Sequence, residues 1–301
     1  MLRRAKALWQ DLEKASGTEL LNLTGVVTIL EQGHPEVEAL LGAGKSRDLV
    51  YEMVSGEEAR RRLPEHVIHD NDVALFDPEG GYVRSERAVT AAMRLASDLG
   101  ATFLGNRTAQ SVERDGDRFI VRTNDEEIIA SRVLVSSGTG AGPSCEALGT
   151  HLAVLPQVLT WFPALDPTVW ASDRMPVFLR RSRDARFYGF PSVDGFTVKV
   201  AASIYLDEVE SMAYPLSWDP QHLDTVRSWV TEYLPGLIPD PVRVTVCADG
   251  YTVDNTGLLG PVPGMEGVVV AVGFSGHGFK MASDLVRSRQ TSSRMAAPKL
   301  M

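Results

Sequence analysis

Three features that are scarce in this 301-residue chain each exclude a class of protein. Its only cysteines, Cys145 and Cys247, are too far apart for a disulfide framework or a C-x-x-C metal motif. No apolar stretch reaches the roughly 20 residues that span a bilayer, and the charged opening MLRRAKALWQDLEKASG lacks the apolar centre of a signal peptide. The net charge of −9 and the absence of a basic tract argue against nucleic acid as a partner. We therefore expect a cytoplasmic protein that binds neither membranes nor nucleic acid.

The motifs of common hydrolases are missing as well. Six histidines are scattered without an H-E-x-x-H or a close His/Cys pair, and no G-x-S-x-G elbow occurs. With 44% apolar residues the chain can nevertheless bury a large core. No metal site is predicted, and the chemistry of a bound organic cofactor is the better direction for a functional hypothesis.

Capping residues and apolar periodicity predict ordinary α/β building blocks. Helices are expected over residues 3–17, from a capping box of Ser55 and Glu58 to before Pro64, from an N-cap at Ser85 to Gly100, and from Asp219-Pro220 through Tyr233. Short strands are expected within residues 20–30, and three strands within 108–142 that are separated by turns at Asp115-Gly116 and Asn124-Asp125. An antiparallel group of strands is expected over 156–165, 175–181, 186–192 and 195–205. Further strands are expected within 242–257 and 267–278.

Two of the apolar strands end in glycines, RVLVSSG at residues 132–138 and VVVAVG at 268–273. In parallel α/β sheets ligands bind at the carboxyl ends of strands, and glycines there let backbone N–H groups approach a ligand closely. Simple turn formation explains such glycines about equally well. Glycines alone therefore leave the presence of a ligand site open.

The segment GFSGHGFK, residues 273–280, directly follows the apolar run VVVAV. With this placement the chain resembles the monomeric sarcosine oxidase and N-methyltryptophan oxidase family, flavoenzymes of the wider glycine oxidase and D-amino-acid oxidase group. In the sarcosine oxidase type, FAD is attached to a cysteine 26 residues before the glycine that opens this loop, and Cys247 occupies that position relative to Gly273. The resemblance implies covalent FAD, a monomer, a small amine or amino-acid substrate, and O₂ as acceptor.

The same resemblance implies a mixed α/β fold with two parts. Residues 1–24, 65–150 and 240–290 would form a FAD-binding domain of the glutathione-reductase-like type, and residues 25–64 and 151–239 an antiparallel substrate domain. The similarity fades after Ser283, and residues 291–301 are expected to be a loosely ordered tail. The chain contains no G-x-G-x-x-G turn for the ADP part of FAD. We therefore expect an N-terminally truncated FAD domain whose core sheet lacks its central strand and whose affinity for FAD is weakened.

Several site residues follow from the resemblance. Those expected to bind the cofactor are Cys247, Gly273, Phe274, Ser275, Gly276, His277, Gly278, Phe279, Lys280 and Gly138. Those expected to act in catalysis are Lys199, which would sit over the flavin, Lys280, which would pair with the substrate carboxylate, and Tyr188, which would line the substrate cavity.

Each of these residues also has a structural explanation. A lone strand cysteine is commonly a small apolar residue, and the bond from Cys247 to flavin would need a depressed thiol pKa or a nearby cation. A strand lysine such as Lys199 usually lies on a solvated face, Lys280 can simply be solvated at a helix start, and Tyr188 can be a core tyrosine. Cys145 is taken as structural.

Two departures from the family pattern concern the substrate pocket. Asp249 stands where relatives often carry an aromatic residue, and Ser203 stands where sarcosine oxidases carry a histidine. The hypothesis is therefore oxidation of the C–N bond of a secondary or N-methyl amino acid, giving an imine and hydrogen peroxide, with the exact substrate open. The alternatives are a related dehydrogenase that uses another electron acceptor and a non-catalytic remnant without flavin.

Overall fold

The computed structural model describes residues 1–46, 49, 51–142, 148–204, 206–209 and 219–290. In that part of the chain the helices are α1 (Leu2–Ser16), α2 (Pro35–Ser46), α3 (Gly56–Arg62), α4 (Ser85–Asp98), α6 (Gln221–Tyr233), α7 (Gly278–Gln290) and the 3-10 turn η1 (Gly138–Ala141). The strands are β1 (Leu21–Asn22), β2 (Val26–Glu31), β3 (Glu52–Ser55), β4 (Asp72–Asp77), β5 (Tyr82–Val83), β6 (Ala109–Asp115), β7 (Arg118–Thr123), β8 (Glu127–Ala130), β9 (Val133–Val135), β10 (Leu152–Pro163), β11 (Val177–Ser182), β12 (Ala185–Phe190), β13 (Thr197–Ala202), β14 (Arg243–Thr252), β15 (Leu258–Val262) and β16 (Met265–Val272).

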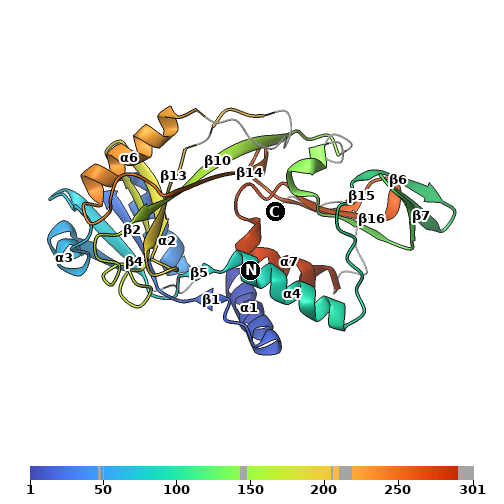
Figure 1. The fold of residues 1–301 in the computed structure, drawn as a ribbon, viewed down its shortest axis with the longest axis horizontal. Coiled ribbons are helices and arrows are strands. Elements are labelled where there is room, and N and C mark those ends of the chain that lie inside the picture. The colour runs from blue at the N-terminus through green and yellow to red at the C-terminus, as the bar shows by residue number, and fades with distance from the viewer. Residues whose placement is uncertain (47–48, 50, 143–147, 205, 210–218, 291–301) are drawn as a thin grey trace.

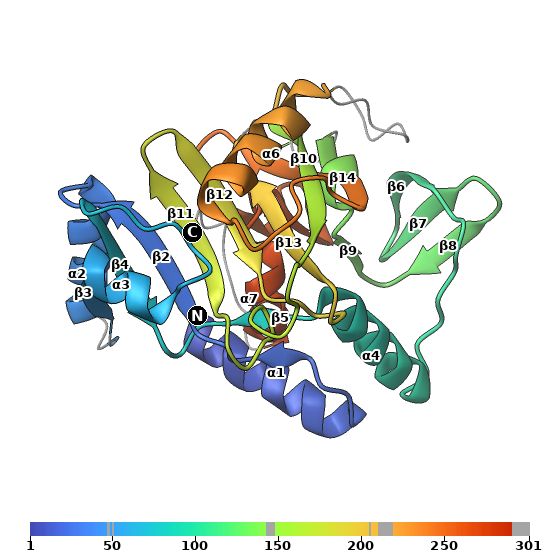
Figure 2. The same ribbon diagram turned by 60° about the vertical axis from the view of Figure 1, so that its left-hand side comes forward.

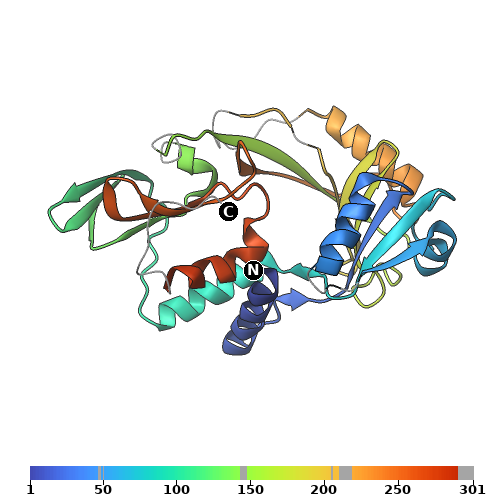
Figure 3. The same ribbon diagram turned by 180° about the vertical axis from the view of Figure 1, so that it is seen from behind.

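The described residues form a large sheet and three smaller ones. The large sheet has the order β14-β10-β13-β12-β11-β2-β4-β3, and its neighbours are antiparallel except for the parallel pair β11 and β2. The sheet β6-β7-β8 lies at the opposite end of the molecule, and helices α1, α4 and α7 gather between the two ends (Figures 1 and 3). The mixed α/β fold class predicted from the sequence is confirmed.

The two faces of the large sheet differ because side chains alternate along each strand. In β13, Val198 and Val200 are fully buried on one face, and Lys199 between them points to the other. The buried face packs against α6, where the ring of Trp229 lies 6.1 Å from that of Phe187 on β12. Figure 2 shows α6 in front of this sheet and α7 behind it. The face that carries Lys199 is called the site face below.

Several predicted elements are confirmed in detail. Helix α1 ends at Gly17, whose φ of 63° gives the left-handed C-cap that glycine favours. Ser55 caps α3 by accepting a 3.3 Å hydrogen bond from the N–H of Glu58, but the Glu58 carboxylate bonds to Arg62 and does not complete the capping box.

Two further predictions are wrong. Arg84, not Ser85, is the N-cap of α4, because its N–H is held by the carbonyl of Leu20 where β1 and β5 meet, and Ser85 is already helical. The third strand predicted within 108–142 is two strands, β8 and β9, which belong to different sheets. Apolar residues occur on both sides of Ser131 and Arg132, and this local pattern does not reveal that the chain passes from one sheet to another there.

No helix among the described residues is long and apolar enough to cross a membrane.

A polar cluster lies inside the core between β11 and α6. The guanidinium of Arg180 is fully buried; it donates to the Asp72 carboxylate at 3.2 Å and lies 4.2 Å from the ring centre of Tyr233. His66 packs edge-on against Phe178, with ring centres 4.8 Å apart. Burial, with a smaller contribution from Arg180, lowers the pKa of His66 to about 3. The imidazole is therefore neutral in the folded protein at physiological pH.

This histidine makes the fold sensitive to acid. In the unfolded chain a histidine titrates near pH 6.5, so between about pH 6.5 and pH 3 the unfolded state holds a proton that folded His66 does not. The His66 contribution to stability should fall by up to about 1.4 kcal/mol for each pH unit lost in that window. Urea unfolding of wild type and His66→Gln at pH 7.5, 6 and 4.5 measures this, and His66→Gln should show the shallower loss. Equal slopes in the two proteins would contradict the assignment.

Candidate active site

A row of cations and aromatic rings crosses the site face. Strand register places Phe190, Lys199, Trp161 and Arg243 side by side on β12, β13, β10 and β14. The Lys199 Nζ lies 5.1 Å from the ring centre of Phe190 and 5.6 Å from that of Trp161, and the Arg243 guanidinium lies 4.4 Å from the same Trp161 ring. Each contact is within range of a cation–π interaction. The Lys199 ammonium is therefore held between two rings rather than extended into solvent.

Burial is the main reason that the pKa of Lys199 falls below its usual value. Arg243 lowers it further, whereas Cys247 and Glu86 raise it. The solvated-face explanation for Lys199 is therefore wrong: the ammonium is mostly shielded from water and has an anionic neighbour, Glu86, at the start of α4.

Tyr188 and Cys247 share the site face with Lys199. Tyr188 lies on β12 two residues before Phe190, and their ring centres are 6.0 Å apart. Burial raises the pKa of Tyr188 to about 12, with additional contributions from Cys247, Asp249 and Tyr251 on β14. The phenol is thus a hydrogen-bond donor on the side of the sheet that faces Cys247.

The Cys247 thiol is half-buried on β14 and points its Sγ toward the carbonyl of Gln157, 3.9 Å away. Burial and the negative charge of Asp249 raise the pKa of this thiol, and Lys199 acts in the opposite direction. A depressed thiol pKa, one of the two conditions expected from the sequence, is therefore contradicted. The other condition, a nearby cation, is met by Lys199.

The glycine-rich loop at 273–278 is fastened to the end of β14. The Ser275 N–H donates to the Gly250 carbonyl at 3.0 Å, and the Thr252 N–H donates to the Ser275 Oγ at 3.3 Å. Phe274 forms an antiparallel bridge with Tyr251. These contacts bring the loop beside the strand that carries Cys247, although 26 residues separate the loop from that cysteine in the chain.

Two glycines make this close approach possible. Gly273 and Gly276 have φ values of 67° and 72°, in the left-handed region that other residues rarely adopt. A Cβ on Gly276 would lie 2.9 Å from the Tyr251 hydroxyl, and one on Gly273 would lie 2.7 Å from Thr252 Cγ2. The loop is followed directly by α7, whose first backbone N–H groups have no partner within the helix and point out of its N-terminus.

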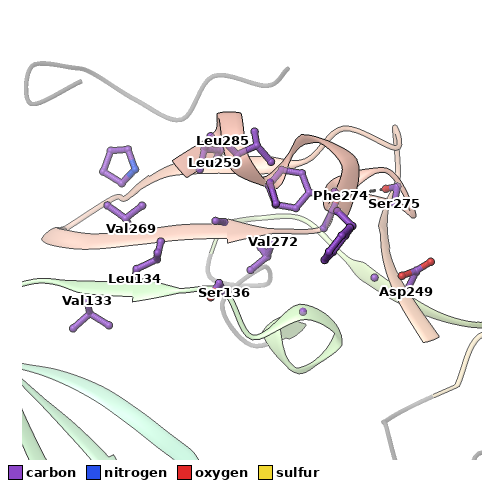
Figure 4. Close-up of a pocket in the computed structure, with 18 of the residues that line it drawn as sticks. Val133, Leu134, Ser136, Asp249, Leu259, Val269, Val272, Phe274, Ser275 and Leu285 are labelled. Carbon is purple, nitrogen blue, oxygen red and sulfur yellow. Dashed lines mark hydrogen bonds between the residues drawn. The ribbon is translucent and has the colours of Figure 1, made fainter. Parts of the chain in front are cut away.

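A large cavity opens at this end of the structure. It holds about 1340 Å³ and is lined by the ends of β9 and β16, the loop and the first turns of α7. Strands β9 and β16 are parallel neighbours, so their glycine-ended carboxyl termini meet at one edge, and Gly138 lines the cavity there. Figure 4 shows Val133 and Leu134 toward one end of the cavity and Phe274, Ser275 and Asp249 at the other.

Helix α1 contacts the backbone of Lys280 and the ring of its neighbour Phe279. The Trp9 indole N–H donates to the Lys280 carbonyl at 3.2 Å, and the Trp9 ring stacks on Phe279 with centres 5.5 Å apart. Partial burial lowers the pKa of Lys280. Phe279 lines the cavity, whereas Lys280 and His277 do not, and His277 is exposed beside Asp249.

The structure thus brings together on one face Lys199, Tyr188 and Cys247, with the loop at its edge. It also adds residues that the sequence did not single out, namely Trp161, Phe190 and Arg243 around Lys199 and Trp9 behind Phe279. Alternation along β10 and β14 places Trp161 and Arg243 on definite faces, but only the pairing register shows that they flank Lys199. Cys145 lies outside the described residues.

The site is suited to the flavin end of FAD. It offers left-handed glycine backbone at a helix N-terminus and a cavity larger than the roughly 300–1,000 Å³ of ordinary small-ligand pockets. The Cys247 thiol, its Lys199 neighbour and Tyr188 lie on the adjoining sheet face and do not line that cavity. No group of three metal-ligating side chains occurs among the described residues. A sheet face with these groups at the edge of a mixed α/β fold is the arrangement of a flavin-dependent oxidoreductase.

Comparison with known proteins agrees. Residues 1–283 match the DAO family of FAD-dependent oxidoreductases, and the chain belongs to that family. It is 27% identical over 286 residues to monomeric sarcosine oxidase of Bacillus sp. (strain B-0618), covering 93% of this chain and 73% of that protein. It is 28% identical over 289 residues to N-methyl-L-tryptophan oxidase of Yersinia pestis (strain Pestoides F), covering 95% and 76%.

A solved structure shows the same fold. NikD, an amino acid oxidase essential for nikkomycin biosynthesis, superposes with a TM-score of 0.85 at 19% identity, covering 98% of this chain and 80% of that one. The family resemblance inferred from residues 273–280 is therefore confirmed, and the protein is a FAD-dependent oxidoreductase similar to amine and amino acid oxidases.

Proposed function

We propose that this protein oxidises the C–N bond of a secondary or N-methyl amino acid with FAD as the redox group and O₂ as the acceptor, releasing an imine and hydrogen peroxide. The observation that carries the proposal is the convergence of Lys199, Tyr188 and Cys247 on one sheet face beside the glycine-rich loop. FAD, when bound, supplies the acceptor for the electron pair that leaves the C–N bond.

The protein residues then have distinct roles. Cys247 holds the cofactor covalently, and residues Gly273 to Phe279 and Gly138 form its backbone cradle. Tyr188, protonated because of its raised pKa, donates a hydrogen bond within the substrate cavity. Lys280 pairs with the substrate carboxylate as a point charge.

Lys199 serves the second half of the reaction. Its ammonium is fixed by the rings of Trp161 and Phe190, so it does not need to reorganise when negative charge develops nearby. In a mostly water-free position a fixed charge stabilises developing negative charge on O₂ more strongly than an exposed lysine would.

The domain boundaries remain part of the proposal. Residues 1–24, 65–150 and 240–290 would contribute to the FAD-binding portion, and 25–64 and 151–239 to the substrate portion. Strand β14 connects the two: it pairs along ten residues with β10 of the large sheet and ends at the contacts that hold the loop. The tail at 291–301 lies outside the described residues.

The experiment is a substrate panel on the purified protein. N-methylglycine, N-methylalanine, N-methyltryptophan and proline are each incubated in air, and peroxide is measured with a coupled peroxidase. For at least one secondary amine we expect one peroxide to be formed for each amine consumed. The corresponding primary amino acid, which lacks the N-alkyl group, should give no peroxide. Turnover seen only with an artificial electron acceptor would show that the protein is a dehydrogenase and not an oxidase. A colourless protein that oxidises none of these amines would refute the proposal.

A further inference from the structure

Asp249 is a carboxylate on the wall of the large cavity. It lies on β14 two residues after Cys247, so its side chain is on the same face of the strand. It lines the large cavity at the end closed by Phe274 and Ser275 (Figure 4). A Cβ on Gly276 would lie 3.4 Å from its Oδ2, which shows how closely the loop covers it.

This carboxylate has no hydrogen bond and no ion pair within the described part of the chain, although it is more than half shielded from water. Burial raises its pKa, and the neighbouring, exposed His277 acts in the opposite direction. A carboxylate that is partly withdrawn from water gains most from a charged partner, because burial disfavours its ionised form. A positively charged group in the cavity would supply that partner at Asp249.

We propose that Asp249 binds the positively charged nitrogen of the substrate, so that the protein takes up its amine as the ammonium ion. This rests on the proposed function, which places the substrate on the site face. The substrate is then held as a zwitterion, with its charged nitrogen at Asp249.

The neighbouring groups are compatible with such a ligand. Tyr188 and Cys247 share this face with Asp249, and their raised pKa values keep the phenol and the thiol uncharged, so neither adds a charge beside the carboxylate. The half-buried cation Lys199 lies farther along this face, in the cross-strand row Lys199–Trp161–Arg243, and Arg243 is six residues before Asp249 on β14. The site face is thus negative at its Asp249 end and positive at its Lys199 end, so the nitrogen of the ligand belongs at the Asp249 end.

The test compares two ligands that differ only in charge at one atom. Glycine betaine carries a quaternary nitrogen, and 3,3-dimethylbutyrate carries a carbon in the same place. Their dissociation constants are measured by isothermal titration calorimetry with the purified protein. Wild type should bind betaine about tenfold more tightly than the carbon isostere, the size expected for one partly buried ion pair.

Three variants locate the effect. Asp249→Asn keeps the side-chain size and should abolish the preference, whereas Asp249→Glu should retain part of it. Asp11→Asn, on the exposed surface of α1, removes the same net charge and should leave the preference intact. Thermal melting confirms that each variant is folded.

The outcomes separate this inference from the proposed activity. Equal affinity of wild type for the two ligands, or an unchanged preference in Asp249→Asn, would overturn the role of Asp249. If the preference depends on Asp249 but no N-methyl amino acid is oxidised, the proposed activity fails and the cation site stands. If amines are oxidised and Asp249→Asn shows the wild-type preference, only the cation site is refuted.

Discussion

Cys247→Ser should yield a protein from which all flavin is released on acid precipitation, whereas wild type should stay yellow. A serine hydroxyl has no accessible anionic form near neutral pH and cannot make the bond that a thiol makes beside the Lys199 cation. The measurement is the absorbance of flavin in the pellet and in the supernatant. Because Cys247 is only half-buried and has one weak contact to Gln157, the substitution should leave the melting temperature nearly unchanged.

The matched control is Cys145→Ser, at the other cysteine of the chain. It should retain the acid-stable colour in full. Retention of colour in Cys247→Ser, or its loss in Cys145→Ser, would show that the attachment is elsewhere. A wild-type protein that carries flavin but releases all of it in acid would show that the cofactor is held without a covalent bond, leaving the family assignment intact.

Lys199→Met should slow the reaction with O₂ by about 100- to 1,000-fold, the usual effect of removing one preorganised group that stabilises developing charge. Methionine keeps the apolar stem between Trp161 and Phe190 but has no ammonium. Substrate should still bleach the bound flavin under anaerobic conditions, because the charge is needed only afterwards. Stopped-flow mixing of the bleached protein with oxygenated buffer measures the affected step.

Two further variants make this test specific. Lys199→Arg keeps the positive charge and should recover most of the rate. Lys280→Met should raise the KM for substrate while leaving the O₂ step unchanged, because Lys280 lies on α7 rather than in the ring-flanked row. If Lys199→Met and wild type react with O₂ at the same rate, the role assigned to Lys199 is wrong.

Local sequence features determined much of the secondary structure. Gly17 ends α1 because its left-handed φ follows from glycine's lack of a Cβ, and the apolar face of α6 was readable from the spacing of Val226, Trp229 and Tyr233. Helix α2 was not predicted, although Pro35 at its first turn and the acidic Glu36 were usable signals. The break between β8 and β9 was missed because it depends on which strands pair, not on local residue types.

By itself the sequence determined the family, through residues 273–280 and their distance from Cys247, and it placed Lys199 on one face of its strand by alternation. Only the tertiary structure decided that Lys199 lies between Trp161 and Phe190. It also decided that the pKa of Cys247 is raised, mainly by burial, and not lowered. The physical reason is that pKa values and ion–ring contacts depend on desolvation and on neighbours across strands. Neighbours across strands are set by pairing register among segments far apart in the chain, which no local pattern encodes.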